Sequence, residues 1–252
     1  IKQYNEEFGD QPLINSSLNE SLFINGTGVN LNLGLIYKPI DYLNLGFVLQ
    51  TPTWFAMNEE YEASMTATYD NYYFEQEDVT LGTETALSDV ILSNYGLITP
   101  FKVGGGATVF LVKYGFISAD VDWVDYSAAR LTSKDFNEGP DNQVIQDFYG
   151  STINYRFGAE GKLENWRIRA GYAHMGDPFL DNSGFDQSTR QLSGGIGIQF
   201  DALKVDFSLV NQNFNSLYRS YKVLDNNGFN YGPLTEIKNS ITSAVVTVGF
   251  NF

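Results

Sequence analysis

The last segment of the chain alternates between two kinds of side chain from residue 242 to residue 252. One set of alternate positions is mostly apolar and ends in aromatic residues, whereas the other is mostly small or polar. This period of two is typical of a β-strand with one apolar face. The first set is Thr242, Ala244, Val246, Val248, Phe250 and Phe252; the second is Ser243, Val245, Thr247, Gly249 and Asn251.

Eight further segments upstream show the same alternation or a weaker form of it, which predicts about nine strands in total. The segment from 95 to 111 is the weakest, because Pro100 and three consecutive glycines interrupt it and indicate a bend or bulge. The others are residues 29–37, 43–50, 117–123, 152–160, 166–172, 191–200 and 203–209.

The connections between these segments alternate between short and long. The short ones are residues 38–41, 112–115, 163–165 and 201–202, and the long ones lie near 57–94, 127–147, 174–189 and 213–239. Outer-membrane barrels have short periplasmic turns and long external loops, whereas a soluble sandwich has no reason to sort its loops. The sequence therefore predicts an all-β, transmembrane, antiparallel up-and-down β-barrel of the outer-membrane type, with residues 1–252 as a single barrel domain.

The orientation also follows from the loops. If Phe252 ends at the periplasmic rim, the short connections lie in the periplasm and the long ones outside. Single-chain bacterial barrels have an even number of strands. We therefore expect an odd number of strands before about residue 21, and expect this chain to be the C-terminal part of a longer protein.

Composition agrees with strands and argues against two other classes. The chain has 19 Phe, 16 Tyr and 24 Gly, and no run of 18 apolar residues that would predict a membrane helix. Its mean hydropathy of -0.20 is expected when each strand is apolar on one face only. A formal charge of -15 argues against nucleic acid, whose binding needs a basic surface. The absence of Cys is compatible with an oxidising periplasm.

Charged residues inside the predicted strands all fall on the face opposite the apolar set, and we expect them to line the lumen. They can form a structural ladder of acids and bases that stiffens the wall, or some of the cations can contact the acidic head group of a ligand. The cationic candidates for ligand binding are Arg156, Arg167, Arg169 and Lys204. The acids are Asp120, Asp122, Glu160 and Asp206.

The predicted loop near 57–94 contains nine Asp or Glu residues and neither Lys nor Arg. A solvated acidic loop is the simplest interpretation. Two alternatives are divalent cations that bridge the loop to lipopolysaccharide phosphates, and an amphipathic surface that captures apolar ligands.

The sequence gives little support for catalysis, and we predict that the protein is not an enzyme. His174 is the only histidine, and its same-face neighbours two residues away are Tyr172 and Gly176 rather than a serine. An acid and histidine pair at the rim stays an alternative, with Asp177 or Asp181 as the acid. No nucleotide loop and no Cys or His metal cluster is present in the sequence, so we expect no cofactor.

Several short motifs resemble the FadL/OmpP1/TodX family of outer-membrane transport proteins. They are Tyr95-Gly-Leu-Ile-Thr-Pro100, Gly104-Gly-Gly-Ala107, the segment 115–127, Phe157-Gly-Ala-Glu160, Arg169-Ala-Gly-Tyr172 with Met175-Gly176, and the aromatic C-terminus. The resemblance covers about residues 25–252. It implies a 14-stranded barrel with an N-terminal hatch that carries long-chain fatty acids or other hydrophobic compounds, with the hatch and five strands absent from this chain.

We therefore expect passive outer-membrane transport of hydrophobic small molecules such as fatty acids or aromatic hydrocarbons in a Gram-negative bacterium. The expected partners are the hydrophobic ligand and outer-membrane lipid, including lipopolysaccharide. The alternative is a non-transporting barrel scaffold that holds a secreted or surface protein through its long loops.

Overall fold

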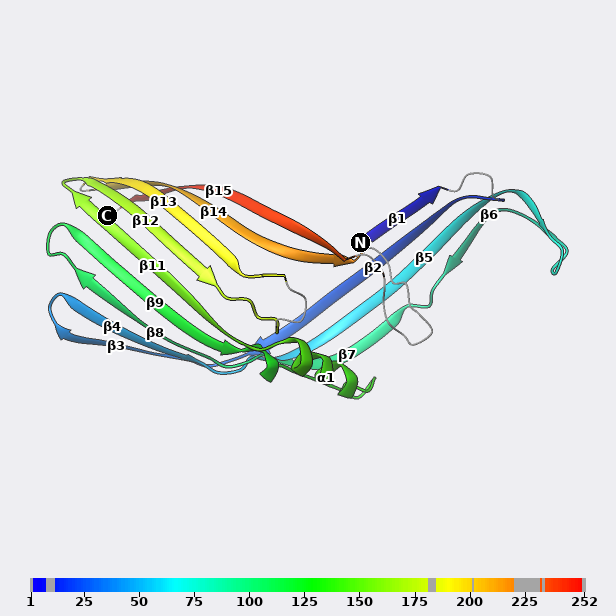
Figure 1. The fold of residues 1–252 in the computed structure, drawn as a ribbon, viewed down its shortest axis with the longest axis horizontal. Helices are drawn as coiled ribbons and strands as arrows, with labels where there is room; N and C mark the ends of the chain where they lie inside the picture. Colours follow the sequence, from blue (N-terminus) through cyan, green and yellow to red (C-terminus); the bar gives the residue numbers. More distant parts are fainter. Residues whose placement is uncertain are drawn as a thin grey trace. The chain divides into compact units, whose positions relative to one another are not determined.

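The computed structural model describes residues 2–7, 12–180, 185–200, 202–219, 232 and 234–250, and it is built almost wholly of antiparallel strands (Figure 1). Contacts between residues divide the chain into two compact units. The first comprises Ile1–Val29, Trp54–Ile98 and Leu131–Pro140, and the second Asn30–Thr53, Thr99–Arg130 and Asp141–Phe252. Each unit contains one sheet. That the chain is a single barrel domain stays a prediction.

The sheet of the second unit has nine strands in the described residues, and they correspond to the nine predicted segments. Successive strands pair antiparallel, and β3 and β15 form the two edges (Figure 1). The strands are β3 (Asn32–Ile40), β4 (Leu43–Gln50), β8 (Lys102–Phe110), β9 (Gly115–Asp125), β11 (Ser151–Leu163), β12 (Trp166–Met175), β13 (Thr189–Gln199), β14 (Leu203–Arg219) and β15 (Leu234–Phe250).

The predicted alternation of short and long connections is confirmed in this sheet. Tight turns join β3 to β4, β8 to β9, β11 to β12 and β13 to β14. In the turn before β9, Gly115 has a φ of 136°, and a Cβ there would overlap the carbonyl oxygen of Glu160 on the neighbouring strand. Only glycine fits that backbone without strain, so the residue fixes the start of β9.

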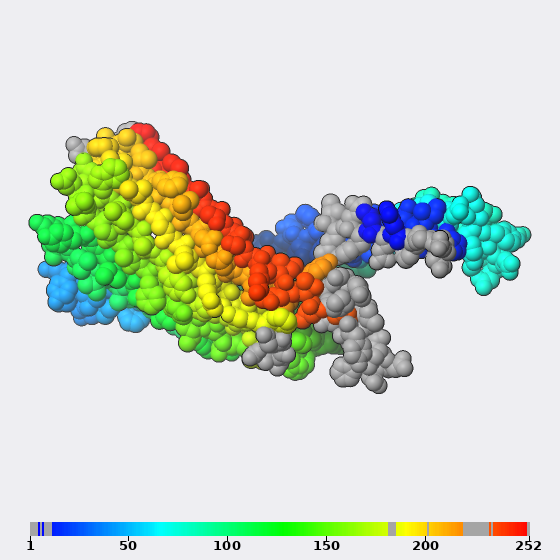
Figure 2. Space-filling view, turned by 45° about the horizontal axis from the view of Figure 1, so that its top comes forward, coloured from blue at the N-terminus to red at the C-terminus, as the bar shows by residue number. Residues whose placement is uncertain are grey.

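The described residues of the second unit do not form the buried apolar core that is typical of a soluble protein. Among the described residues Val124 is the single buried apolar side chain, whereas Leu192 is 60% exposed and Val246 is 65% exposed. Exposed apolar residues occur on every strand from β11 to β15. Figure 2 shows the surface of these strands side by side, from green through yellow to red. Exposed apolar surface of this extent is typical of contact with lipid or with a partner.

The first unit corrects one interpretation of the sequence. The region near 57–94, predicted to be a loop, forms three strands of a six-stranded sheet. The alternation was hidden there because Glu, Asn and Thr occur on both faces, although Thr, Tyr and Phe favour strands. The strands of this sheet are β1 (Lys2–Glu7), β2 (Leu13–Val29), β5 (Trp54–Phe74), β6 (Val79–Leu87), β7 (Ile91–Ile98) and β10 (Arg130–Ser133).

The first unit also holds most of the negative charge of the chain. Its three segments contain 15 acidic residues and two lysines, which gives -13 of the total of -15. The second unit therefore accounts for only -2. Part of the acidity noted in the sequence thus lies on strands of the sheet, as at Glu59, Glu60 and Glu84, and part in the turns between them, as at Glu75 and Asp78.

Two other predicted loops also contain regular structure. The region 127–147 includes β10 and helix α1 (Gly139–Phe148), preceded by the 3-10 turn Tyr126–Ala128. In the described residues, α1 is the single α-helix, and it is too short and too polar to cross a membrane. The connection predicted at 213–239 is shorter than predicted, because β14 and β15 are each 17 residues long and extend into that range.

Four strands of the first sheet continue in sequence into strands of the second after short interruptions. The neighbour order β2, β5, β7, β10 in one sheet matches β3, β4, β8, β9 in the other. Threonine side chains hydrogen-bond at the interruptions: Thr51 Oγ1 accepts from Leu31 N at 2.9 Å, and Thr99 Oγ1 accepts from Thr53 N at 2.9 Å. The predicted bend at Pro100 is one of these interruptions.

The three glycines after Pro100 are not a bulge, because they lie in regular register within β8. A Cβ at Gly104 would overlap the Asp122 carboxylate, and one at Gly106 would overlap that of Asp120. These glycines leave room for the acidic side chains of β9, which lie on the same face.

Candidate ligand site

Strand register places the eight charged residues that the sequence predicts to line the lumen on one face of the second sheet. Residues that are directly opposite in an antiparallel pair share a face. Arg156 pairs with Asp120, and Glu160 pairs with Arg169. Arg169 and Arg167 alternate along β12, and the register continues through β13 to Lys204 and Asp206 of β14. We call this side the polar face, and the opposite side, which carries Leu192 and Val246, the apolar face.

One ion cluster on the polar face joins three strands. Asp122 on β9 is almost buried, and its Oδ2 lies 2.7 Å from Nη1 of Arg156 on β11. The same oxygen lies 3.0 Å from Nζ of Lys102 on β8. Because a part-buried carboxylate without partners is costly, the two cations stabilise this position. Lys102 was not among the candidates from the sequence, since Pro100 and the glycine run obscured the strand it begins.

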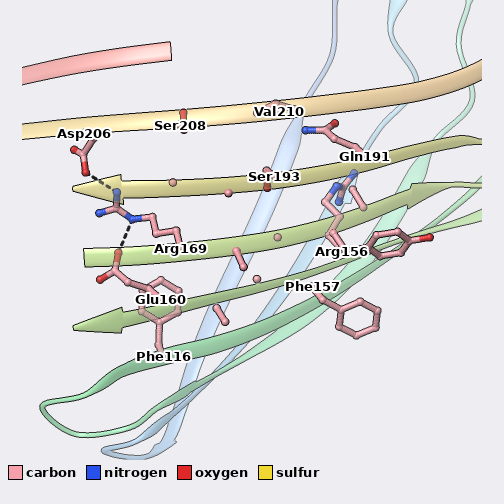
Figure 3. Close-up of a pocket in the computed structure, with 18 of the residues that line it drawn as sticks. Phe116, Arg156, Phe157, Glu160, Arg169, Gln191, Ser193, Asp206, Ser208 and Val210 are labelled. Carbon is pink, nitrogen blue, oxygen red and sulfur yellow. Dashed lines mark hydrogen bonds and ion pairs between the residues drawn. The ribbon is translucent and has the colours of Figure 1, made fainter. Parts of the chain in front are cut away.

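A second ion cluster joins β11, β12 and β14. The Arg169 guanidinium lies between two carboxylates, with Nε 2.7 Å from Glu160 Oε2 and Nη1 hydrogen-bonded to Asp206 (Figure 3). Lys204 Nζ lies 3.2 Å from the other oxygen of Asp206. Arg169 therefore ties three strands together, and the ladder interpretation accounts for these contacts.

A hollow of about 690 Å³ lies over the second cluster. Its lining combines the charged residues Arg156, Glu160, Arg169, Lys204 and Asp206 with apolar side chains such as Phe116 and Val210 (Figure 3). The hollow exists because small residues occupy the face between the larger ones: Gly158, Gly171, Ser193, Gly195 and Ser208. Its volume is within the range of small-molecule sites.

Three of the four cationic candidates line this hollow, and Arg167 does not. The Arg167 guanidinium donates to the carbonyl oxygens of Glu164 and Trp166, both at 3.0 Å, in the turn between β11 and β12. It also lies 3.8 Å from Glu160. Arg167 thus stabilises the turn between β11 and β12. A role in ligand binding stays a prediction for all four cationic candidates.

The cations exceed the acids by one in each ion cluster. Lys102 and Arg156 face one carboxylate, that of Asp122. In the second cluster three cations face the two carboxylates of Glu160 and Asp206. Each cation nevertheless has a carboxylate within 4 Å, so an anionic ligand would compete with existing ion pairs.

His174 lies on the apolar face, at the end of β12 away from the short turns. Its ring stacks on Tyr155 with centroids 4.8 Å apart, and its Nδ1 is buried without a hydrogen-bond partner in the described residues. Asp177 accepts instead from the backbone N–H groups of Phe179 and Gln187 at 2.9 Å each. Asp181, the other predicted acid, lies outside the described residues. In the described part of the chain, no group of His, Cys, Asp and Glu could hold a metal ion.

Comparison with known proteins gives a fold but no sequence family. No known family model and no curated protein matches the chain. The solved structure titled "CymD monoaromatic hydrocarbon channel" is similar with a TM-score of 0.55 and 16% identity, over 96% of this chain and 58% of that one. A FadL homologue from Pseudomonas aeruginosa is similar with a TM-score of 0.43 and 12% identity, over 98% of this chain and 76% of that one.

The chain thus spans 58% of the length of the hydrocarbon channel. At 16% identity the likeness concerns the fold alone, and it agrees with the antiparallel strand order and the alternating turns described above. The predicted all-β, antiparallel fold of the outer-membrane barrel type is confirmed, and this chain shares it with the hydrocarbon channel.

Proposed function

We propose that the second unit lies in the outer membrane of a Gram-negative bacterium and passes hydrophobic small molecules through it without an energy source. The observation that carries the proposal is the contrast between the two faces of one sheet. The apolar face is suited to lipid, and the polar face has a hollow of about 690 Å³ with both apolar and charged lining.

Membrane placement is supported by the length and the ends of the strands. β12 has 10 residues, close to the roughly 9–11 that cross a bilayer as a tilted strand. On the apolar face Trp166 begins this strand and His174 stands near its end, with Tyr155 beside it. Aromatic residues at both ends of an apolar band are typical of outer-membrane barrels.

The ligand class we propose is apolar, with at most one weakly held anionic group. Phe116 and Val210 supply apolar surface in the hollow, and every cation there already has a carboxylate partner. Fatty acids and aromatic hydrocarbons both fit this description. Burial of the apolar part would drive binding, and a change in affinity on conformational change would release the ligand.

The test compares two tryptophan substitutions at adjacent positions of β13. Ser193→Trp fills the hollow, whereas Leu192→Trp, its matched control, points from the apolar face. Uptake of a radiolabelled aromatic hydrocarbon and of oleate would be followed in cells that depend on this protein. We expect Ser193→Trp to lower uptake of at least one substrate on the order of tenfold and Leu192→Trp to leave it unchanged. Equal uptake by both variants contradicts the proposal.

The scaffold function remains the second candidate because of the first unit. This unit carries a formal charge of -13 and contains a six-stranded sheet where the sequence predicts a loop. If extraction of the purified protein with organic solvent yields no hydrophobe above the background of an unrelated barrel, and both variants transport equally, the scaffold is the better account.

A further inference from the structure

The apolar face has a polar patch at the end where the long connections lie. We define the headgroup patch by five residues of β13, β14 and β15. Register pairs Arg190 with Asn213 and Asn213 with Ser240, and pairs Asn215 with Lys238, so all five share the side of Leu192. The patch surrounds a hollow of about 300 Å³. Its residues are Arg190, Asn213, Asn215, Lys238 and Ser240.

The patch begins where the apolar band ends. Successive register rows on this face change from polar to apolar within two steps along the strands. Arg190, Asn213 and Ser240 form one row. The next contains Leu192, Asn211 and Thr242, and the rows after it contain Gly194, Leu209 and Ala244, then Ile196, Phe207 and Val246. This change marks the boundary between hydrocarbon and the headgroup layer.

The patch has an excess of positive charge. The Arg190 side chain is 62% exposed and lies 3.3 Å from Asp186. Lys238 is exposed and has no carboxylate within 4 Å among the described residues. Asp186 is the one acid that lines the hollow, and it is held by the backbone N–H of Ser188 at 2.9 Å. Glu236 shares this face two residues from Lys238 but does not line the hollow. The two cations and one acid that line the hollow attract an anionic headgroup at a membrane boundary.

Side-chain amides extend the patch with ordered hydrogen-bonding groups. Asn211, Asn213 and Asn215 project from β14 at every second position. Asn213 Nδ2 donates to Asn211 Oδ1 at 2.6 Å, and Asn215 Nδ2 donates to the Asp186 carbonyl oxygen at 2.9 Å. Amides have a donor and an acceptor each and can serve sugar hydroxyls as well as phosphate. A row of asparagine side chains would be unfavourable in hydrocarbon, because each polar group without a hydrogen-bond partner there costs free energy.

We propose that the headgroup patch binds the phosphorylated sugar headgroup of a glycolipid in the outer leaflet. Arg190 and Lys238 contact phosphate, the asparagines contact sugar hydroxyls, and the acyl chains cover Leu192 and Leu209 on the band below. The patch lies at the long-connection end, which faces outward in the predicted orientation. This inference rests on the proposed membrane placement and is independent of transport.

The experiment measures lipid binding to the full-length protein by native mass spectrometry from detergent micelles. The probes are diphosphorylated lipid A and the same lipid with both phosphates removed. We expect the protein to retain the phosphorylated form on the order of tenfold better, a preference that the double variant Arg190→Ala, Lys238→Ala loses. The matched control, Lys38→Ala with Lys113→Ala, removes two exposed cations at the short-turn end and keeps the preference.

Lys238→Gln alone, a milder change at an exposed position, should lower the preference by a smaller factor and guards against misfolding of the double variant. Folding is followed by heat-modifiable migration on gels. Equal binding of the two lipid A forms, or an unchanged preference in the double variant, overturns the proposal. Full displacement of lipid A by excess inorganic phosphate also overturns it, because the patch would then be a site for free anions. Failure of the uptake test with Ser193→Trp leaves this result untouched, so the two proposals can fail separately.

Discussion

The two sheets of the molecule are both antiparallel, yet only one of them sorts its side chains by face. On β12 of the second unit, the charged residues Arg167 and Arg169 share one face, and the other face carries Trp166 and Ile168. On β5 of the first unit, Glu59 and Glu60 are adjacent and therefore point to opposite faces. A sheet with lipid on one side must exclude charge from that side, whereas a sheet with water on both sides need not.

Net charge follows the same division. The first unit carries -13 and the second -2, although the second holds more residues. In the second unit acids and bases meet in ion clusters such as that of Glu160, Arg169 and Asp206. In the first unit acids meet tyrosines instead: Tyr61 donates to Glu20 at 2.7 Å, and Tyr95 to Glu59 at 3.2 Å. Solvent can screen the acids of the first unit, whereas the lumenal acids need cations.

The strongest test of this contrast places the same charge on an exposed apolar position of each sheet. Ile196→Arg, on the apolar face of β13, should lower the free energy of unfolding by about 2–4 kcal/mol, because the guanidinium would lie in hydrocarbon. Leu92→Arg on β7 is the matched change in the first unit, where Leu92 is 67% exposed, and its cost should stay within about 0.5 kcal/mol. Guanidinium unfolding in lipid vesicles, followed by tryptophan fluorescence, measures both. Equal costs would show that the two sheets face the same medium.

A second comparison uses one glycine from each unit. Gly115→Ala should lower the free energy of unfolding by about 2–3 kcal/mol, because φ is 136° and the new Cβ would overlap the Glu160 carbonyl oxygen. Gly82→Ala on β6 meets no atom within 4 Å and should change stability by less than about 1 kcal/mol, with either sign. The same unfolding assay distinguishes them. A neutral Gly115→Ala would mean that the turn before β9 can relax.

How far the sequence could be interpreted depended on the same contrast. The nine strands of the second unit were predictable because lipid and lumen impose opposite chemistry on alternate positions, as in β15. The sequence pattern predicts a loop in place of β5 and β6 because their polar residues occur on both faces. The ion pairs of Arg156 and Arg169 could not be predicted, because they depend on the register between neighbouring strands and the periodicity within one strand does not give that register. The sequence pattern does not single out Lys102, because Pro100 and the glycine run interrupt the alternation on either side of it.

The smallest expected effect is a difference in how pH acts on the two units. Hydrogen bonds from the Ser188 hydroxyl and backbone N–H lower the pKa of Asp186, in the connection between β12 and β13. A group with a lowered pKa contributes stability above its unfolded pKa of about 3.9 and loses it as pH falls through the folded value. The hydrogen bond to Glu20 raises the pKa of Tyr61 in the first unit. That contribution is present below an unfolded pKa of about 10 and is lost as pH rises through the folded value.

Asp186→Asn should therefore flatten the acid limb of a stability profile and leave the alkaline limb as it is, and Tyr61→Phe should do the reverse. Asp186 is exposed and Tyr61 is only half-buried, so each effect is small and is best measured as the difference in unfolding midpoint between variant and parent at each pH. Arg190→Lys, which keeps the charge beside Asp186, serves as control for the acid limb. The contrast between the units holds that cations and backbone N–H groups stabilise the acids of the second unit, whereas tyrosine hydroxyls stabilise those of the first. If both variants flatten the same limb of the profile, the two units do not differ in this way.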